Sequence, residues 1–101
     1  TAGMPKRPLV QVKRGQTVRL RMNNQTGWPH AMHIHGHHFK ALNGNTGDGY
    51  GPVWRDTIVV RRGQDLTVGF VADNAGKWML HCHMLEHQAA GMMTWVNVEI
   101  D

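Results

Sequence analysis

Apolar and polar residues alternate along short stretches that make up much of the chain. Residues 9–13 (LVQVK) and 17–22 (TVRLRM) both alternate, and a turn signal at residues 14–16 separates them. A period of two is typical of a strand with one buried face, so each stretch predicts a strand. Similar stretches bounded by turn-forming residues predict further strands near residues 31–42, 54–60, 66–72, 77–83 and 93–100.

Short strands at regular spacing with glycine-containing turns favour an all-β sandwich over a helical or parallel α/β fold. A length of 101 residues suits a single domain over residues 1–101 with one hydrophobic core. One short helix is expected near residues 85–90. Trp78 and Trp95 fall inside predicted strands, so we expect both to pack in the core.

The most distinctive chemistry lies in residues 81–92 (HCHMLEHQAAGM), where the only cysteine of the chain stands between two histidines. Cys82, His87 and Met92 offer a thiolate, an imidazole and a thioether. Two imidazoles, one thiolate and a weak axial thioether are typical of blue electron-transfer copper, because soft sulfur favours Cu(I) and imidazole suits both oxidation states. The segment therefore supplies three of the four ligands of such a site.

The histidines on either side of Cys82 indicate a second centre. Successive side chains of a strand point to opposite faces, so His81 and His83 share one face and Cys82 lies on the other. Two metal centres could then meet across one residue. The backbone between them would be a short covalent route for electrons.

A second histidine-rich segment, residues 30–39 (HAMHIHGHHF), provides further ligands. His33 and His35 share a strand face, as His81 and His83 do, so two strands could place four imidazoles around one spot. His30 stands apart at the start of the segment and could complete the set of Cys82, His87 and Met92.

These two motifs, HAMHIHG and HCHMLEHQAAGM, resemble in this order the C-terminal cupredoxin domain of multicopper oxidases, the family of laccases and bacterial copper-resistance oxidases. The resemblance covers nearly the whole chain and implies a Greek-key β-sandwich. It implies that a type 1 copper is held by His30, Cys82, His87 and Met92, and a type 2 copper by His33. It further implies that His35, His81 and His83 are type 3 ligands of a trinuclear cluster.

The resemblance also implies an activity. A small-molecule or metal-ion reductant would give single electrons to the type 1 copper, and Cys82 would pass them through His81 and His83 to the cluster, where O2 is reduced to water. The periplasm or another extracytoplasmic space is the expected location. The reductant itself is not fixed by these motifs.

Half of the trinuclear cluster is expected to come from elsewhere. In the family an N-terminal cupredoxin domain brings two further His-x-His pairs, which this chain lacks. We therefore expect the C-terminal domain of a longer polypeptide, with its first strand truncated near Thr1. A second chain is the other source, since a twofold dimer could bring its four histidines to the same place.

Three other functions would account for only part of this pattern. A stand-alone blue-copper protein would use only His30, Cys82, His87 and Met92, and would relay electrons or bind copper without reducing O2. Structural zinc usually recruits paired cysteines, and the chain has one. A cupin-type site would leave Cys82 without a role.

At one position that is expected to supply protons, the chain differs from many members of the family that it resembles. Many bacterial relatives carry an acid directly after the last type 1 histidine, whereas this chain has Gln88, and an amide cannot replace a carboxylic acid as a proton donor. Asp56 and Glu86 are alternative acids. His37 and His38 follow the ligand motif and are interpreted as supporting or surface residues.

Charge excludes one class of partner. The net charge is +4, but the basic residues are scattered and form no continuous patch with stacking aromatics, so nucleic-acid binding is not expected. No apolar stretch is long enough to cross a membrane.

Overall fold

The computed structural model of the chain describes residues 4–82 and 93–100, and this part is built from strands. The helix predicted for residues 85–90 lies outside the described residues. The strands are β1 (Val10–Lys13), β2 (Thr17–Asn23), β3 (His30–Ile34), β4 (Lys40–Ala41), β5 (Thr57–Val60), β6 (Asp65–Val71), β7 (Gly76–Cys82) and β8 (Met93–Glu99).

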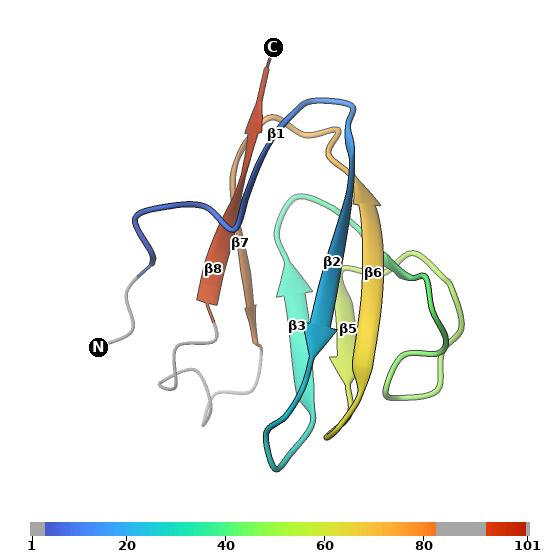
Figure 1. Cartoon of the computed structure of the whole chain (residues 1–101). Helices are drawn as coiled ribbons and strands as arrows, with labels where there is room; N and C mark the ends of the chain where they lie inside the picture. Colours follow the sequence, from blue (N-terminus) through green and yellow to red (C-terminus); the bar gives the residue numbers. More distant parts are fainter. Residues whose placement is uncertain (1–3, 83–92, 101) are drawn as a thin grey trace.

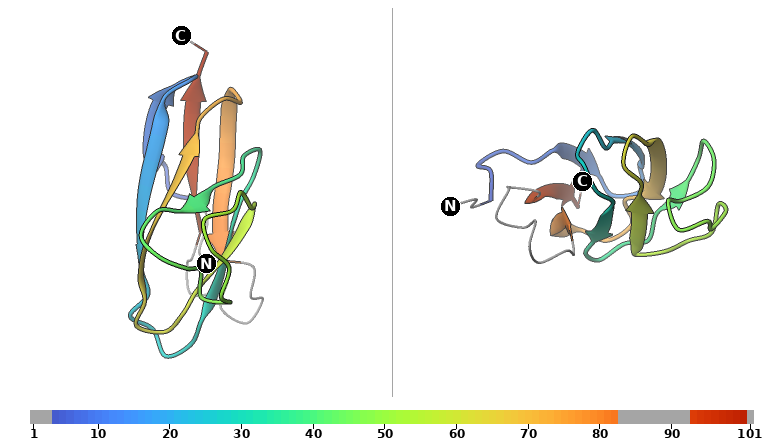
Figure 2. Two further views of the ribbon diagram at one scale, coloured as in Figure 1. Left: turned by 90° about the vertical axis from the view of Figure 1, so that its right-hand side faces the viewer. Right: turned by 90° about the horizontal axis from the view of Figure 1, so that it is seen from below.

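The strands form two sheets packed face to face, with five strands in the order β1-β8-β7-β3-β5 and three in the order β2-β6-β4 (Figures 1 and 2). From β1 to β7 each strand belongs to the opposite sheet from the one before it. β1 runs parallel to β8, while β7 is antiparallel to both β8 and β3. The predicted all-β Greek-key sandwich is confirmed.

The core lies between the two sheets and takes every second residue of their strands. In β2, for example, Val18 and Leu20 are buried while Thr17, Arg19 and Arg21 are exposed. Burying one such aliphatic side chain stabilises the fold by about 1.5–3 kcal/mol. The side chains with almost no exposure include Ile34, Phe39, Ile58, Val60, Leu66, Val68, Phe70 and Val96.

The strand predicted over residues 31–42 is broken. β3 ends at Ile34, and β4 pairs with β6 in the other sheet. Gly36 makes the change of direction with a φ of 72°, a conformation that side chains with a Cβ rarely adopt. A Cβ at Gly36 would also lie 2.6 Å from the Trp78 ring. The chain therefore needs glycine here for two separate reasons.

The two tryptophans expected in the core have different environments. Trp78 packs against the core cluster, as expected. The expectation for Trp95 was wrong, because Trp95 is paired with Met79 on the face of β7 and β8 that points away from the other sheet. Its Nε1 donates to the carbonyl oxygen of Pro5 at 2.8 Å, and Lys77 Nζ lies 5.5 Å from the ring centroid.

Candidate metal centre

The pairing of β3 with β7 decides which ligand candidates meet. Cys82 lies opposite Met32, and His81 lies opposite His33. Residues directly opposite each other on antiparallel strands point to the same side of the sheet. His33 and His81 therefore share the outer face of the five-stranded sheet, and Cys82 points to the inner face, where the core lies.

On the inner face, the structure brings His30 and Cys82 together. His30 Nδ1 lies 3.3 Å from Cys82 Sγ, although the two residues are 52 positions apart. Cys82 has no exposed surface and His30 is 3% exposed. A thiol and an imidazole thus meet in the protein interior. The two other residues predicted for this site, His87 and Met92, lie outside the described residues.

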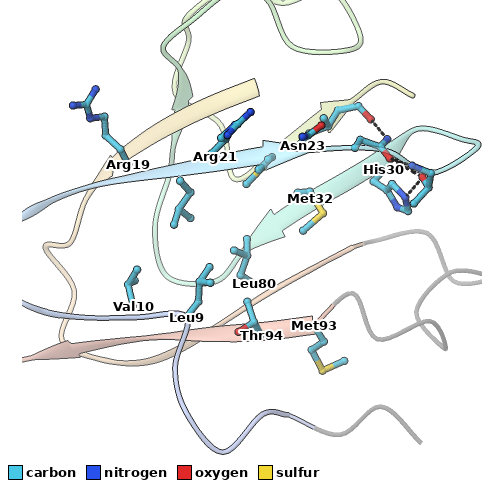
Figure 3. A pocket seen from close by; sticks show the side chains of 15 residues that line it. Leu9, Val10, Arg19, Arg21, Asn23, His30, Met32, Leu80, Met93 and Thr94 are labelled. Atoms are coloured by element: carbon cyan, nitrogen blue, oxygen red, sulfur yellow. Dashed lines mark hydrogen bonds between the residues drawn. The ribbon is translucent and has the colours of Figure 1, made fainter. Parts of the chain in front are cut away.

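A cavity of about 500 Å³ lies beside His30, between β2 and the five-stranded sheet. Figure 3 shows Met32 and Leu80 pointing into it, whereas the Arg19 and Arg21 side chains point away. Most of the wall is apolar. The surroundings of His30 therefore combine a low-polarity cavity on one side with the thiol on the other.

On the outer face, three imidazoles meet. The ring centroids of His33 and His35 are 5.0 Å apart, those of His35 and His81 are 5.2 Å apart, and those of His33 and His81 are 5.6 Å apart. The Nε2 atoms of His35 and His81 approach to 3.1 Å. The fourth imidazole predicted for this group, that of His83, lies outside the described residues.

Backbone carbonyls orient two of these rings. His33 Nδ1 is 3.0 Å from the Asp56 carbonyl oxygen, and His81 Nδ1 is 3.2 Å from the Cys82 carbonyl oxygen. His33 Nδ1 also lies 3.0 Å from Thr57 Oγ1, a hydroxyl that can donate or accept. A carbonyl only accepts hydrogen bonds, so in His81 Nδ1 carries the proton and Nε2 keeps its lone pair. This is the usual arrangement of a metal-binding histidine, whose second nitrogen donates to a carbonyl or carboxylate.

His35 is held through its backbone. Its N–H donates to the Met79 carbonyl oxygen at 2.9 Å, and its own carbonyl accepts from His37 Nδ1 at 3.2 Å. The His37 side chain has no exposed surface, and its Nε2 accepts from the Asn74 N–H at 3.3 Å. Both ends of the His37 ring are thus bonded to backbone groups, which fixes the turn after β3.

Asn74 ties this turn to the one before β7. Its side-chain amide donates to the Gly36 carbonyl oxygen at 3.1 Å, and its own carbonyl accepts from Trp78 Nε1 at 2.8 Å. Sequence reasoning found no role for Asn74, because its contacts depend on two turns that meet only in the folded chain. His38, by contrast, is exposed.

The described ligand candidates on each face are suitable for copper, but each face supplies only part of a ligand set. Two nitrogens bound at about 2 Å to one metal ion lie roughly 3 Å apart, which matches the separation of the His35 and His81 Nε2 atoms. Cys82 with His30 offers the soft and intermediate donors that copper favours. Within residues 4–82 and 93–100, however, no group of three or more His, Cys, Asp or Glu side chains is arranged to hold a metal ion alone.

The same described ranges contain no helix long and apolar enough to span a membrane.

Comparison with known proteins identifies the family. The family model described as "Multicopper oxidase" matches residues 1–101. Laccase-1 of Fomitopsis schrenkii is 37% identical in an alignment of 93 residues that covers 87% of this chain and 17% of the laccase. Multicopper oxidase MmcO of Mycobacterium tuberculosis is 39% identical over 85 residues, which are 84% of this chain and 16% of MmcO. The chain thus spans about a sixth of the length of these relatives.

Solved structures agree with this assignment. Lac15 from a marine microbial metagenome is 46% identical with a TM-score of 0.79, over 97% of this chain and 25% of Lac15. A multi-copper oxidase from Pseudomonas thermotolerans is 32% identical with a TM-score of 0.81, over 92% of this chain and 22% of that one. The resemblance to the family's C-terminal cupredoxin domain is confirmed, and the chain belongs to the multicopper oxidase family.

Proposed function

We propose that this chain carries the type 1 copper site and half of the trinuclear cluster of an oxidase that couples one-electron oxidation of a substrate to reduction of O2 to water. The observation that supports this most is the placement of His81 and Cys82, which are adjacent in β7 yet face opposite sides of one sheet. His30 lies beside Cys82, and His33 and His35 lie beside His81.

The proposed ligands divide between the two faces. His30, Cys82, His87 and Met92 hold the type 1 copper on the inner face. On the outer face, His33 is a type 2 ligand, and His35, His81 and His83 are type 3 ligands. Copper bound at these residues supplies reversible one-electron chemistry.

At the inner face, the fold holds Cys82 in a fixed position and excludes water from its sulfur. Cys82 must give up its thiol proton to bind a metal, and burial beside His30 keeps water away from the sulfur. The sheet fixes the Cys82 backbone through its pairing with β3. A preset ligand arrangement limits rearrangement when the oxidation state changes.

The proposed electron path runs from the Cys82 sulfur through the backbone to the His81 imidazole. These residues are joined by one peptide link, and the His81 ring is also bonded to the Cys82 carbonyl at 3.2 Å. The two faces are therefore linked by a covalent route and a hydrogen bond. His83 would provide the matching branch on the other side of Cys82.

The outer face requires a partner. We propose an N-terminal cupredoxin domain of the same polypeptide, or a second chain, that covers His33, His35 and His81 and adds two His-x-His pairs. Its support is the partial ligand set within the described ranges, together with the 17% of the Fomitopsis schrenkii laccase that this chain spans. A small-molecule or metal-ion reductant and a periplasmic or secreted location complete the proposal.

The test is spectroscopy with oxygen uptake on the full-length, copper-loaded protein. We expect an intense blue thiolate band, type 2 and type 3 signals, and O2 consumption with a one-electron reductant. The control variant His38→Gln should give the same spectra and the same O2 consumption, since this histidine is exposed and outside the proposed ligand set. A blue band without O2 consumption would instead support the alternative, a stand-alone blue-copper electron carrier.

A further inference from the structure

The loop that leads into His30 contains a buried amide with a fixed orientation. Asn24 is 7% exposed, and its Nδ2 donates to the carbonyl oxygens of Trp28 at 2.9 Å and Val60 at 3.0 Å. Carbonyl oxygens only accept, so the NH2 end of the Asn24 side chain must face them. Its Oδ1 atom consequently faces Thr26.

Thr26 takes its own orientation from this oxygen. The Thr26 N–H donates to Asn24 Oδ1 at 3.0 Å, and Thr26 Oγ1 lies 2.6 Å from the same oxygen. The Trp28 carbonyl oxygen, at 3.1 Å from Oγ1, is a second acceptor. A hydroxyl has one proton, and both of these neighbours can only accept it. The Thr26 hydroxyl therefore turns a lone pair toward its third neighbour.

That third neighbour is His30. Its Nε2 lies 2.7 Å from Thr26 Oγ1, and Figure 3 shows His30 within this group of hydrogen bonds at the loop end of β3. Since the Thr26 proton is directed elsewhere, Nε2 must carry a proton and donate it to Oγ1. A neutral imidazole has one N–H, so Nδ1 keeps its lone pair. Nδ1 is the atom that lies 3.3 Å from Cys82 Sγ.

We propose that Thr26, oriented by Asn24, is a positioning residue that selects the Nε2–H form of His30 and so presents the Nδ1 lone pair to a metal bound at Cys82. This inference rests on the proposed type 1 site. A metal can bind only an unprotonated ring nitrogen, and the hydrogen bond made by the other nitrogen sets which one that is. Two side chains outside the ligand set would thus prepare one ligand before the metal arrives.

The direct test is nitrogen NMR of the metal-free, full-length protein labelled with 15N at histidine, with His30→Gln identifying the His30 signals. We expect the Nε2–H form in the unmodified protein. Thr26→Val keeps the side-chain shape without the hydroxyl, and should lower the ratio of Nε2–H to Nδ1–H forms by roughly fivefold to tenfold. Thr26→Ser should restore it.

A second readout uses copper. In competition with a chelator, Thr26→Val should retain copper at the blue site roughly 10- to 100-fold less tightly, while Thr26→Ser should match the unmodified protein. Thr94→Val is the matched control, because Thr94 lines the same cavity and the same hydroxyl-to-methyl change is made there.

The two proposals fail in different ways. An Nδ1–H form of His30 in the unmodified protein, or an unchanged ratio in Thr26→Val, would overturn the role of Thr26. The first of these results decides the matter even if Thr26→Val does not fold. An unmodified protein with the Nε2–H form that binds no blue copper would contradict the proposed type 1 site instead.

Discussion

The two faces of the β3–β7 pair carry similar residue types in different surroundings. On the inner face Cys82 and His30 are 0% and 3% exposed, whereas on the outer face the His33 side chain is 21% exposed. His30 and Cys82 lie within the sandwich, whereas on the outer face His33 is partly exposed and His81 is 9% exposed. Folding of the domain therefore shields the proposed inner centre, while the exposure of the outer centre depends on what covers the sheet.

The faces also differ in how their imidazoles are oriented. On the inner face His30 is bonded to the side chain of Thr26, which a substitution can remove. On the outer face His81 is bonded to a backbone carbonyl, which a substitution cannot delete, and His33 is bonded to a backbone carbonyl and to the Thr57 hydroxyl. A mutation can therefore remove the Thr26 contact of His30, whereas the carbonyl contacts of His33 and His81 change only if the backbone moves.

Cys82→Ser should have the largest effect. Removing the thiolate should abolish the blue band and reduce oxygen-coupled turnover to the background rate, because the proposed path to His81 starts at the Cys82 sulfur. The outer imidazoles should still bind copper, which metal analysis and spectroscopy of the full-length protein can measure. Persistence of the blue band would contradict the assignment of the inner site.

His35→Ala should disrupt the outer face and leave the inner face intact, the reverse of Cys82→Ser. Oxygen uptake should fall by more than about 100-fold, since even residues that only support a ligand cost 10- to 100-fold when changed. The blue band should remain, because His30 and Cys82 lie on the other side of the sheet. His38→Ala serves as the control for removing a nearby histidine. A simultaneous loss of the blue band would show that the faces are not independent.

Gly36→Ala tests the turn that holds His35. The added methyl group meets the Trp78 ring at a backbone φ of 72°, so we expect a loss of roughly 2–5 kcal/mol in unfolding free energy from urea denaturation. Gly51→Ala is the matched control, since a Cβ there meets only Asn45 Oδ1 at 3.9 Å. Equal stability of the two variants would show that the turn adjusts without cost.

Asp65→Asn should have the smallest effect and gives a reference away from both faces. The Arg21 guanidinium on the outside of the other sheet donates to Asp65 Oδ1 at 2.9 Å and lowers the pKa of that carboxyl. A lowered folded-state pKa adds stability above the unfolded pKa, and this contribution is lost as pH falls through the folded value.

Both side chains of this pair are exposed, at 69% and 43%, so solvent screens it. Near neutral pH the thermal midpoint should match that of the unmodified protein within error, and the blue band should be unchanged. A large drop in the midpoint would mean that the β2–β6 pair depends on this contact.

The sequence predicts which face of the sheet each proposed ligand occupies, but not the residues that hold these ligands in place. Alternation along a strand is a local property, so the opposite placement of His81 and Cys82 could be predicted from their order alone. The break at Gly36 could not, because it depends on a glycine conformation and on the Trp78 ring packed against it. Asn74 was missed for a related reason, since Gly36 and His37 become its neighbours only when two distant turns come together. Thr26 was missed although its partners lie within four residues, because the direction of each hydrogen bond depends on the loop conformation.

The register of β3 on β7 has a consequence for how this protein can change over time. Along a strand, ligands on the same face are an even number of residues apart, and ligands on opposite faces are an odd number apart. The spacing of the ligands therefore sets the faces of both centres together. A single-residue insertion between His30 and His33 would turn imidazoles toward the core or His30 toward the surface. Within these two strands, both centres are therefore inherited as one unit.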